Sequence, residues 1–185
     1  MRLSSRTVAS LDKLAMHGLK TCFAGRTAEV TKLTVLPDMK GMPHTRSVML
    51  SVALVECRMV MFIHYGQDAA CRAHFATMLD KDLSQLDDRA FLDAVSEAGN
   101  VACGTFNRDL GRVFTHLGMS TPAMVDSQCA RHLGLLRHAH QRHYVIELNA
   151  RVQFHATLCV CPYTPLDFEL DPLDDLADAG ELEMF

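Results

Sequence analysis

The feature that most constrains this chain is a long amphipathic segment that begins near Phe91 and ends near Leu117. At about 100° per residue, its apolar side chains cluster on one side of a helix. They are Phe91, Val95, Ala98, Ala102, Phe106, Val113 and Leu117. The segment is therefore predicted to be one long helix, followed by a turn, with its apolar face buried in the core. Asp87, three residues after Ser84, indicates a capping-box start in which Asp replaces the usual Glu.

The opposite side of this helix carries an unusual set of polar residues. A stripe whose members lie within about 40° of one line along the helix contains Asp93, Glu97, Asn100, Gly104, Asn107 and Gly111. Lys and Arg are absent from this stripe between Asp93 and Asn107, and Glu97 has no cation at i−4 or i+4. Gly99 and Gly104 flank the Glu97 and Asn100 pair, and small residues let another backbone approach closely. The stripe indicates a docking surface; the alternative is a polar face that merely meets water.

The remaining periodicity predicts a helix, a strand, a hairpin, a second helix, the long helix and further strands. The helices are expected at residues 8–23 and 67–79, and the strands at residues 28–36, 46–56, 58–65, 123–125, 143–149 and 152–161. This order indicates an α+β domain with a largely antiparallel sheet packed with helices.

The pattern Asp93-x3-Glu97-x2-Asn100, with Pro122 near its end, resembles the signature of the CheC/CheX/FliY chemotaxis phosphatases. The gap before Pro122 is one residue shorter than in that signature. The order of elements over residues 8–162 also resembles the CheX form. CheC and FliY generally carry two copies of the Glu-x2-Asn site, but here Glu147-Leu148-Asn149 has the wrong spacing. The resemblance is therefore to the single-site CheX type.

This resemblance implies a CheC-like fold and a phosphatase that dephosphorylates the aspartyl phosphate of a CheY-like receiver, in chemotaxis or two-component signalling. Asn100 would orient the attacking water, and Glu97 would pair with the receiver's active-site lysine. Asp93, Gly104 and Asn107 would dock the partner. The chain would need no cofactor of its own, because the receiver supplies Mg²⁺, and it would form a symmetric homodimer through sheet edges. The alternative is a non-catalytic receiver-binding or scaffold module.

Charge divides the chain into two parts. Eight acids and no basic residue lie between Asp167 and Glu183, which leaves 18 basic and 14 acidic residues elsewhere. We therefore expect a CheX-like phosphatase domain over residues 1–163 and a flexible acidic tail over residues 164–185. The alternative for the tail is a short helix, Leu173 to Met184, that docks on a partner. The mild positive balance of the remainder argues against a nucleic-acid partner.

The seven cysteines have no framework spacing, so reduced thiols in the cytoplasm are expected. No apolar run reaches the length of a membrane span, and no membrane partner is expected. Cys159 and Cys161 would lie on one strand face as buried thiols. His64, His74 and Cys103 are interpreted as isolated core or surface residues.

Four histidines lie close together in the sequence and raise a third functional class, a His/Cys metal hydrolase. They are His132, His138, His140 and His143. Three arginines share the segment and disfavour a bound cation, so a solvated basic loop is the preferred interpretation. They are Arg131, Arg137 and Arg142.

Overall fold

The computed structural model describes residues 2–23, 30–149 and 152–170. Within these residues the strands form a seven-stranded sheet of order β1-β6-β7-β3-β2-β4, and β5 also pairs with β2. All strand pairs are antiparallel. The strands are β1 (Val30–Leu36), β2 (Arg46–Ala53), β3 (Cys57–Tyr65), β4 (Gly118–Met119), β5 (Ala123–Asp126), β6 (His140–Leu148) and β7 (Val152–Pro162). The helices are α1 (Ser5–Phe23), α2 (Ala69–Met78) and α3 (Asp88–Leu110), with 3-10 helices η1 (Leu83–Gln85) and η2 (Ser127–Leu136). The predicted α+β architecture is confirmed.

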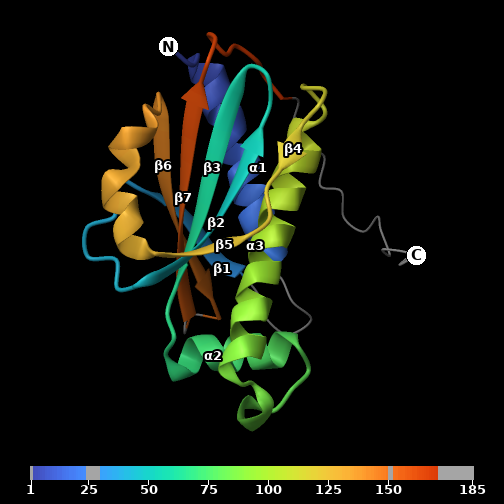
Figure 1. The fold of residues 1–185 in the computed structure, drawn as a ribbon, viewed down its shortest axis with the longest axis vertical. Coiled ribbons are helices and arrows are strands. Elements are labelled where there is room, and N and C mark those ends of the chain that lie inside the picture. The colour runs from blue at the N-terminus through green and yellow to red at the C-terminus, as the bar shows by residue number, and fades with distance from the viewer. Residues whose placement is uncertain (1, 24–29, 150–151, 171–185) are drawn as a thin grey trace.

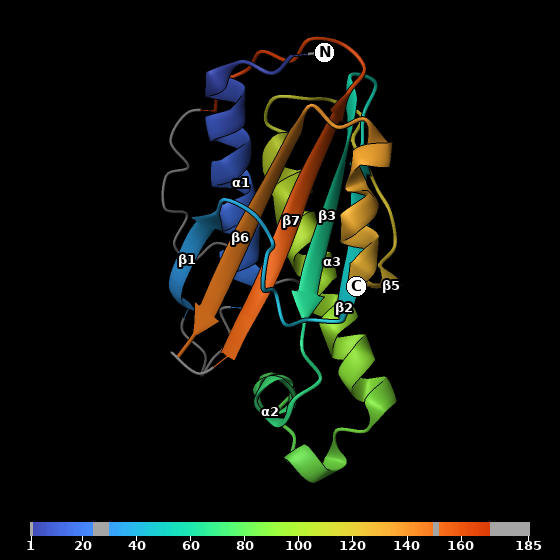
Figure 2. The ribbon, with the colours of Figure 1, turned by 90° about the vertical axis from the view of Figure 1, so that its left-hand side faces the viewer.

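The sheet separates two helical layers. Helices α1 and α3 cover one face, and η2 covers the other, as Figures 1 and 2 show. Helices α1 and α3 approach closely at Gly18, because a Cβ there would lie 2.5 Å from the carbonyl oxygen of Ala102. Only glycine permits this crossing without a backbone shift. Together the two helices form a continuous layer whose outer side includes the polar stripe of α3.

Strand β3 contributes to both cores because it is buried on both faces. Met61 and Ile63 belong to the large core beneath α1 and α3. Val60 and Phe62 belong to a smaller core, which Leu133 of η2 covers. The η2 layer was not predicted from the sequence, where this segment was expected to be a loop.

Helix α2 closes one end of the sheet, below the strands in Figure 1. Its Phe75 ring packs edge-on against Phe91 of α3, with 5.6 Å between centroids, and against Phe154 of β7, with 5.8 Å. This aromatic contact is of the edge-to-face kind that stabilises cores beyond the area it buries. It fixes the beginning of α3 relative to the sheet.

The start of α3 differs from the prediction. Asp87 is the N-cap, and its side chain accepts a hydrogen bond from the Ala90 backbone N–H at 2.7 Å. Ser84 instead lies exposed in η1. The capping box from Ser84 to Asp87 was therefore wrong, since the short η1 turn intervenes and leaves Asp87 itself to cap the helix. The helix ends at Leu110, with Gly111 as its C-cap, so Val113 and Leu117, which were predicted to lie on its apolar face, come after its end.

The segment after β7 packs against α1. Leu166, Phe168 and Leu170 are buried with the main core. The Phe168 backbone N–H donates to Thr7 Oγ1 at 2.8 Å, and the Leu170 N–H donates to Ser10 Oγ at 3.1 Å. The packed region therefore continues to at least residue 170, and the boundary predicted at residue 163 is too early. Alternating apolar residues place one side of this extended segment on α1. The remaining acidic residues, 171–185, lie outside the described residues.

Candidate functional site

The outer face of α3 presents Glu97 and Asn100 side by side, one helical turn apart. Glu97 is exposed and Asn100 is half-buried. The Asn100 Nδ2 donates a hydrogen bond to Glu97 Oε2 at 3.2 Å. Within residues 2–23, 30–149 and 152–170, no cation forms an ion pair with Glu97. A carboxylate and an amide are thus placed together on a helix face, where an incoming partner can contact both.

Asp93, Gly104 and Asn107 lie on the same stripe of α3 as the pair. Asp93 is exposed, one turn before Glu97. Gly104 faces open space, since a Cβ there would meet no atom within 4 Å. Asn107 is half-buried, and its Oδ1 is buried without a hydrogen-bond partner in the described part of the chain. The side of α3 predicted from helical periodicity is therefore the side that faces outward.

Gly99 has a different role from the one predicted. It is buried against β2, where a Cβ would lie 2.9 Å from Val48 Cγ1 and 3.0 Å from Leu50 Cδ1. Gly99 therefore permits close packing of α3 on the sheet, and only Gly104 leaves room for an external partner. Helical periodicity agrees with this difference, since Gly104 lies within the polar stripe and Gly99 lies about 120° away from its line, toward the apolar side.

Two methionines border the stripe on its sheet side and were not predicted as part of the site. Met124 of β5 accepts contacts at its sulfur from Ser96 Oγ at 3.9 Å and from Tyr65 Oη at 3.8 Å. Met124 and Met119 remain 40% and 41% exposed. Pro122, between them, was the only sequence signal for this border. The polar stripe therefore has an apolar margin of two methionines, a residue type that is enriched at protein–protein interfaces.

The histidine-rich segment is not the solvated basic loop that was predicted. It forms η2 and the first residues of β6. His143 is buried, and its Nδ1 lies 2.9 Å from Thr157 Oγ1. Arg142 is paired with Asp12 of α1 at 3.1 Å, with Nη2 facing Oδ2. The sheet register places these polar residues beneath other elements, and the sequence alone does not reveal that burial.

The described residues contain no group of three His, Cys, Asp or Glu side chains placed to hold a metal ion. Cys159 and Cys161 are free and buried, as predicted. No described helix is both long and apolar enough to cross a membrane.

Comparison with known proteins finds similar structures but no match in sequence. No family model matches the chain, and no curated protein matches it. A chain of the CheX–CheY–BeF3–Mg²⁺ complex from Borrelia burgdorferi is similar, with a TM-score of 0.59 and 13% identity, over 83% of this chain and 97% of that one. The chemotaxis protein CheX from Vibrio vulnificus has a TM-score of 0.55 and 17% identity, over 83% and 97%. FliY from Thermotoga maritima has a TM-score of 0.52 and 15% identity, over 88% and 93%. The fold predicted from the resemblance is confirmed: the chain has the architecture of these chemotaxis proteins.

Proposed function

We propose that this protein is a phosphatase that hydrolyses the aspartyl phosphate of a CheY-like receiver, in chemotaxis or another two-component pathway. The observation that carries the proposal is the contact between Asn100 and Glu97 on the outer face of α3. An amide and a carboxylate in this arrangement can orient water and bind a cation without acid–base chemistry. The fold supports the proposal because it is shared with CheX and FliY.

The reaction requires little of the phosphatase beyond positioning. A water oxygen attacks the phosphorus, the bond from phosphorus to the receiver's aspartate breaks, and the electron pair stays on the released carboxylate. The water proton passes to the phosphate product. Asn100 would hold this water by accepting a hydrogen bond from it at Oδ1, which fixes the attack direction. The receiver would supply Mg²⁺, and the Borrelia complex, which contains CheX, CheY, BeF3 and Mg²⁺, supports that source.

Docking would change the hydrogen bonds of the pair. In the free protein the Asn100 amide donates to Glu97 at 3.2 Å. A lysine ammonium from the receiver is a stronger partner for the Glu97 carboxylate than the neutral amide is, because both groups of that hydrogen bond are then ionised. The Glu97 carboxylate would then turn to the lysine and release the Asn100 amide toward the phosphoryl group. The site would thus be completed only when the correct partner is bound.

The docking surface would extend from the pair in both directions along α3. Asp93 and Asn107 would contribute polar contacts, and Gly104 would allow the receiver backbone to approach. Met119 and Met124 would cover apolar surface of the partner, since flexible methionine side chains adapt to irregular surfaces. Asp93→Ala should weaken docking less than Glu97→Ala, because Asp93 lies at the end of the stripe.

We also propose a symmetric homodimer and a cytoplasmic location. Strand β1 ends the described sheet, and a strand edge is a template for pairing with a second copy. All seven cysteines are free, which fits a reducing compartment. Sedimentation equilibrium should show a dimer at tens of micromolar; a monomer throughout that range, roughly assay concentration, would contradict it.

The decisive experiment is single-turnover dephosphorylation of a Mg²⁺-bound phospho-receiver across protein concentrations. Asn100→Ala should lower the maximal rate by roughly 10²–10³, as for other lost positioning groups, and leave receiver binding nearly unchanged. Gln85→Ala, on the exposed η1 turn, is the control and should keep the parent rate. If Asn100→Ala dephosphorylates the receiver as fast as the parent, Asn100 does not have this role.

The same surface also supports a second candidate, a non-catalytic receiver-binding or scaffold module. The apolar margin of Met119 and Met124 favours docking whether or not turnover follows. This candidate predicts that the parent binds the phospho-receiver without accelerating its decay. Glu97→Ala would then weaken binding, and no variant of Asn100 would change the decay rate.

A further inference from the structure

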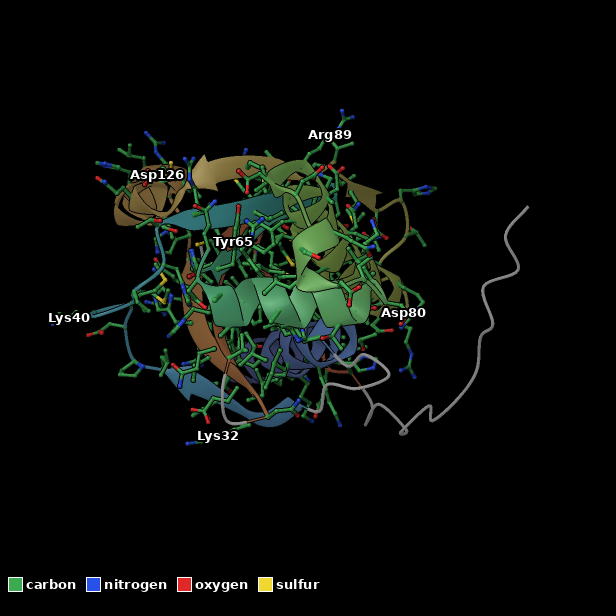
Figure 3. The ribbon with its side chains drawn as sticks, turned by 90° about the horizontal axis from the view of Figure 1, so that it is seen from below. Lys32, Lys40, Tyr65, Asp80, Arg89 and Asp126 are labelled. Atoms are coloured by element: carbon green, nitrogen blue, oxygen red, sulfur yellow. The ribbon has the colours of Figure 1, made fainter. Side chains whose placement is uncertain are left out.

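A second polar region lies on the η2 side of the sheet, away from the stripe of α3. The loop between β1 and β2 and the beginning of η2 enclose a cavity of 680 Å³. Figure 3 shows Lys40 and Asp126, which both line it, on the side of the molecule opposite Asp80. Cavities of this size lie within the range that binds small molecules.

A chain of buried hydrogen bonds joins two parts of the cavity wall. The contacts run from Gln141 Nε2 to His143 Nε2 (3.0 Å), from His143 Nδ1 to Thr157 Oγ1 (2.9 Å), from Thr157 Oγ1 to His64 Nε2 (3.0 Å), from His64 Nδ1 to Ser47 Oγ (2.6 Å) and from Ser47 Oγ to Ser127 Oγ (2.8 Å). Gln141, His143 and Ser127 line the cavity, whereas the three middle residues do not. Those three are fully buried. This chain of hydrogen bonds therefore begins at one part of the cavity wall, runs along the face of the sheet, and ends at another part of the wall.

The hydrogen bonds of this chain can all run in one direction. A neutral imidazole has one donor nitrogen and one acceptor nitrogen, and a hydroxyl has one proton to donate. If Gln141 donates to His143, each following group can donate onward, and Ser127 accepts a hydrogen bond from Ser47. The Ser127 hydroxyl is then free to donate into the cavity. The Gln141 carbonyl oxygen is free to accept there.

The reverse direction needs the other orientation of the Gln141 amide, whose oxygen and nitrogen are nearly equivalent in shape. It also needs the other tautomer of His143 and of His64, and rotated hydroxyls. Ser127 then accepts from the cavity and Gln141 donates to it. In both states the cavity offers one donor and one acceptor, at opposite ends of the same chain. A ligand that has both a donor and an acceptor satisfies either state, and its binding would select one of them.

Three charged side chains line the cavity, and each of its two carboxylates has a partner within the protein. Asp38 pairs with Lys40, with 3.6 Å between Oδ2 and Nζ, and the Lys40 side chain is 91% exposed. The Asp126 carboxylate accepts from the Gln128 backbone N–H at 2.7 Å. Burial lowers the pKa of His44 to about 4 and also lowers the pKa of His143, although Asp38 opposes the latter shift.

The histidines in the cavity wall are therefore neutral at pH 7. Methionine and proline supply apolar wall, namely Met39, Met42 and Pro43. Methionine sulfur makes favourable contacts with aromatic rings. A flat, uncharged ring with polar edges matches this combination better than an ion does.

We propose that this cavity binds a small, uncharged, planar heterocycle with hydrogen-bond donors and acceptors on its edge, the chemistry of a nucleobase or nucleoside. Ser127 and Gln141 contact its polar edge, and Met42 lies against its ring. The buried hydrogen bonds through His64 couple the two ends, so that one end donates to the ligand when the other end accepts from it. The site is separate from Glu97 and Asn100, so it does not depend on the phosphatase proposal.

The test uses the full chain and free nucleobases and nucleosides as probes, with ligand-observed saturation-transfer NMR and protein-observed titration. At least one probe should bind saturably. Ser127→Ala and Gln141→Leu should weaken that binding at least tenfold. The matched controls, Ser84→Ala and Gln85→Leu, carry the same changes on the exposed η1 turn and should leave it unchanged. Met42→Ala, which alters the loop and not the chain, should also weaken it and serves if the first two variants unfold.

A second readout separates this site from a purely structural network. Binding should move the imidazole ¹⁵N resonances of His64, which is fully buried and does not line the cavity. Binding without any change at His64 would overturn the role of the chain. Absence of saturable binding by every nucleobase and nucleoside, or equal binding by Ser127→Ala and the parent, would overturn the ligand site.

Discussion

Two sides of the protein carry groups of interacting polar residues, and the two groups differ in their exposure to solvent. On the outer face of α3, Glu97 and Asn100 lie at the surface and contact each other. On the η2 side of the sheet, His64 and Thr157 are fully buried and joined by a hydrogen bond. An exposed pair can exchange its partner for another molecule at little cost, whereas a buried chain loses stability when any member is removed. The first arrangement therefore suits docking and turnover, and the second suits a fixed internal framework.

Apolar packing should exceed both polar regions in its effect on stability, and two truncations measure this. Ending the chain after residue 163 removes Leu166, Phe168 and Leu170 from the core. Each buried large side chain contributes about 2–5 kcal/mol, so the loss should exceed about 5 kcal/mol, comparable to the whole stability of a domain. Ending it after residue 170 keeps these contacts and should preserve cooperative melting. Equal melting of the two truncated proteins would show that the segment contributes little.

Removing the centre of the buried chain should cost stability without affecting turnover. Thr157→Val keeps the side-chain shape but leaves His64 Nε2 and His143 Nδ1 without their partner. Each unsatisfied buried group costs about 1–3 kcal/mol, so chemical denaturation should show a loss of roughly 2–5 kcal/mol. Thr121→Val, at an exposed position, is the control and should stay within about 0.5 kcal/mol. A marked fall in the dephosphorylation rate for a folded Thr157→Val protein would break the separation of the two regions.

The opposite pattern is expected for Glu97. Glu97→Ala should weaken binding of the phospho-receiver by about 2–5 kcal/mol, because the partner's lysine would lose its carboxylate. The free energy of unfolding should change by no more than about 0.5 kcal/mol, since Glu97 is exposed. Isothermal titration and denaturation of the same preparation measure both quantities. A large stability loss with intact binding would place Glu97 in the framework and not in the docking surface.

Acid should distinguish the two regions through the histidines. Burial lowers the pKa of His64 to about 3 and that of His44 to about 4, from 6.5 in the unfolded chain. The unfolded state therefore binds more protons, and stability is fully present above pH 6.5 and falls as the pH drops toward these values. At about 1.4 kcal/mol per pH unit, buried His64 should contribute a loss of roughly 2 kcal/mol by pH 5. Denaturation at pH 7, 6 and 5 measures it, and His64→Gln should flatten the dependence; a parent protein with constant stability over this range would contradict it.

The smallest effects come from two glycines of α3 whose surroundings differ. Gly104→Ala should stabilise the protein by about 0.5–1 kcal/mol, because alanine favours helix and the added Cβ meets open space. It should nevertheless weaken receiver binding if the partner's backbone approaches there. Gly99→Ala should instead destabilise by about 1–3 kcal/mol through overpacking against Val48 and Leu50. Thermal melts of the pair test this, and a shift in the same direction for both would show that the contact at Gly99 relaxes freely.

The sequence by itself determined the features that depend on local periodicity. A helix repeats every 3.6 residues, so the spacing of Asp93, Glu97 and Asn100 was enough to place them on the outer face of α3. Apolar runs likewise predicted the hairpin of β2 and β3, and alternation predicted the two strands that form β6 and β7. The predicted roles of Glu97 and Asn100 remain predictions, because geometry alone does not measure turnover.

Only the tertiary structure decided which polar residues meet across the chain. His143 faces Thr157 because β6 and β7 pair in that register, and Ser47 faces His64 by the register of β2 and β3. Gly99 lies so close to Val48 and Leu50 of β2 that a Cβ would clash, and only the packing of α3 on the sheet sets that distance. Leu170 meets Ser10 across a separation of 160 residues. Such contacts depend on strand register and long-range packing, and no local pattern encodes the register between distant segments.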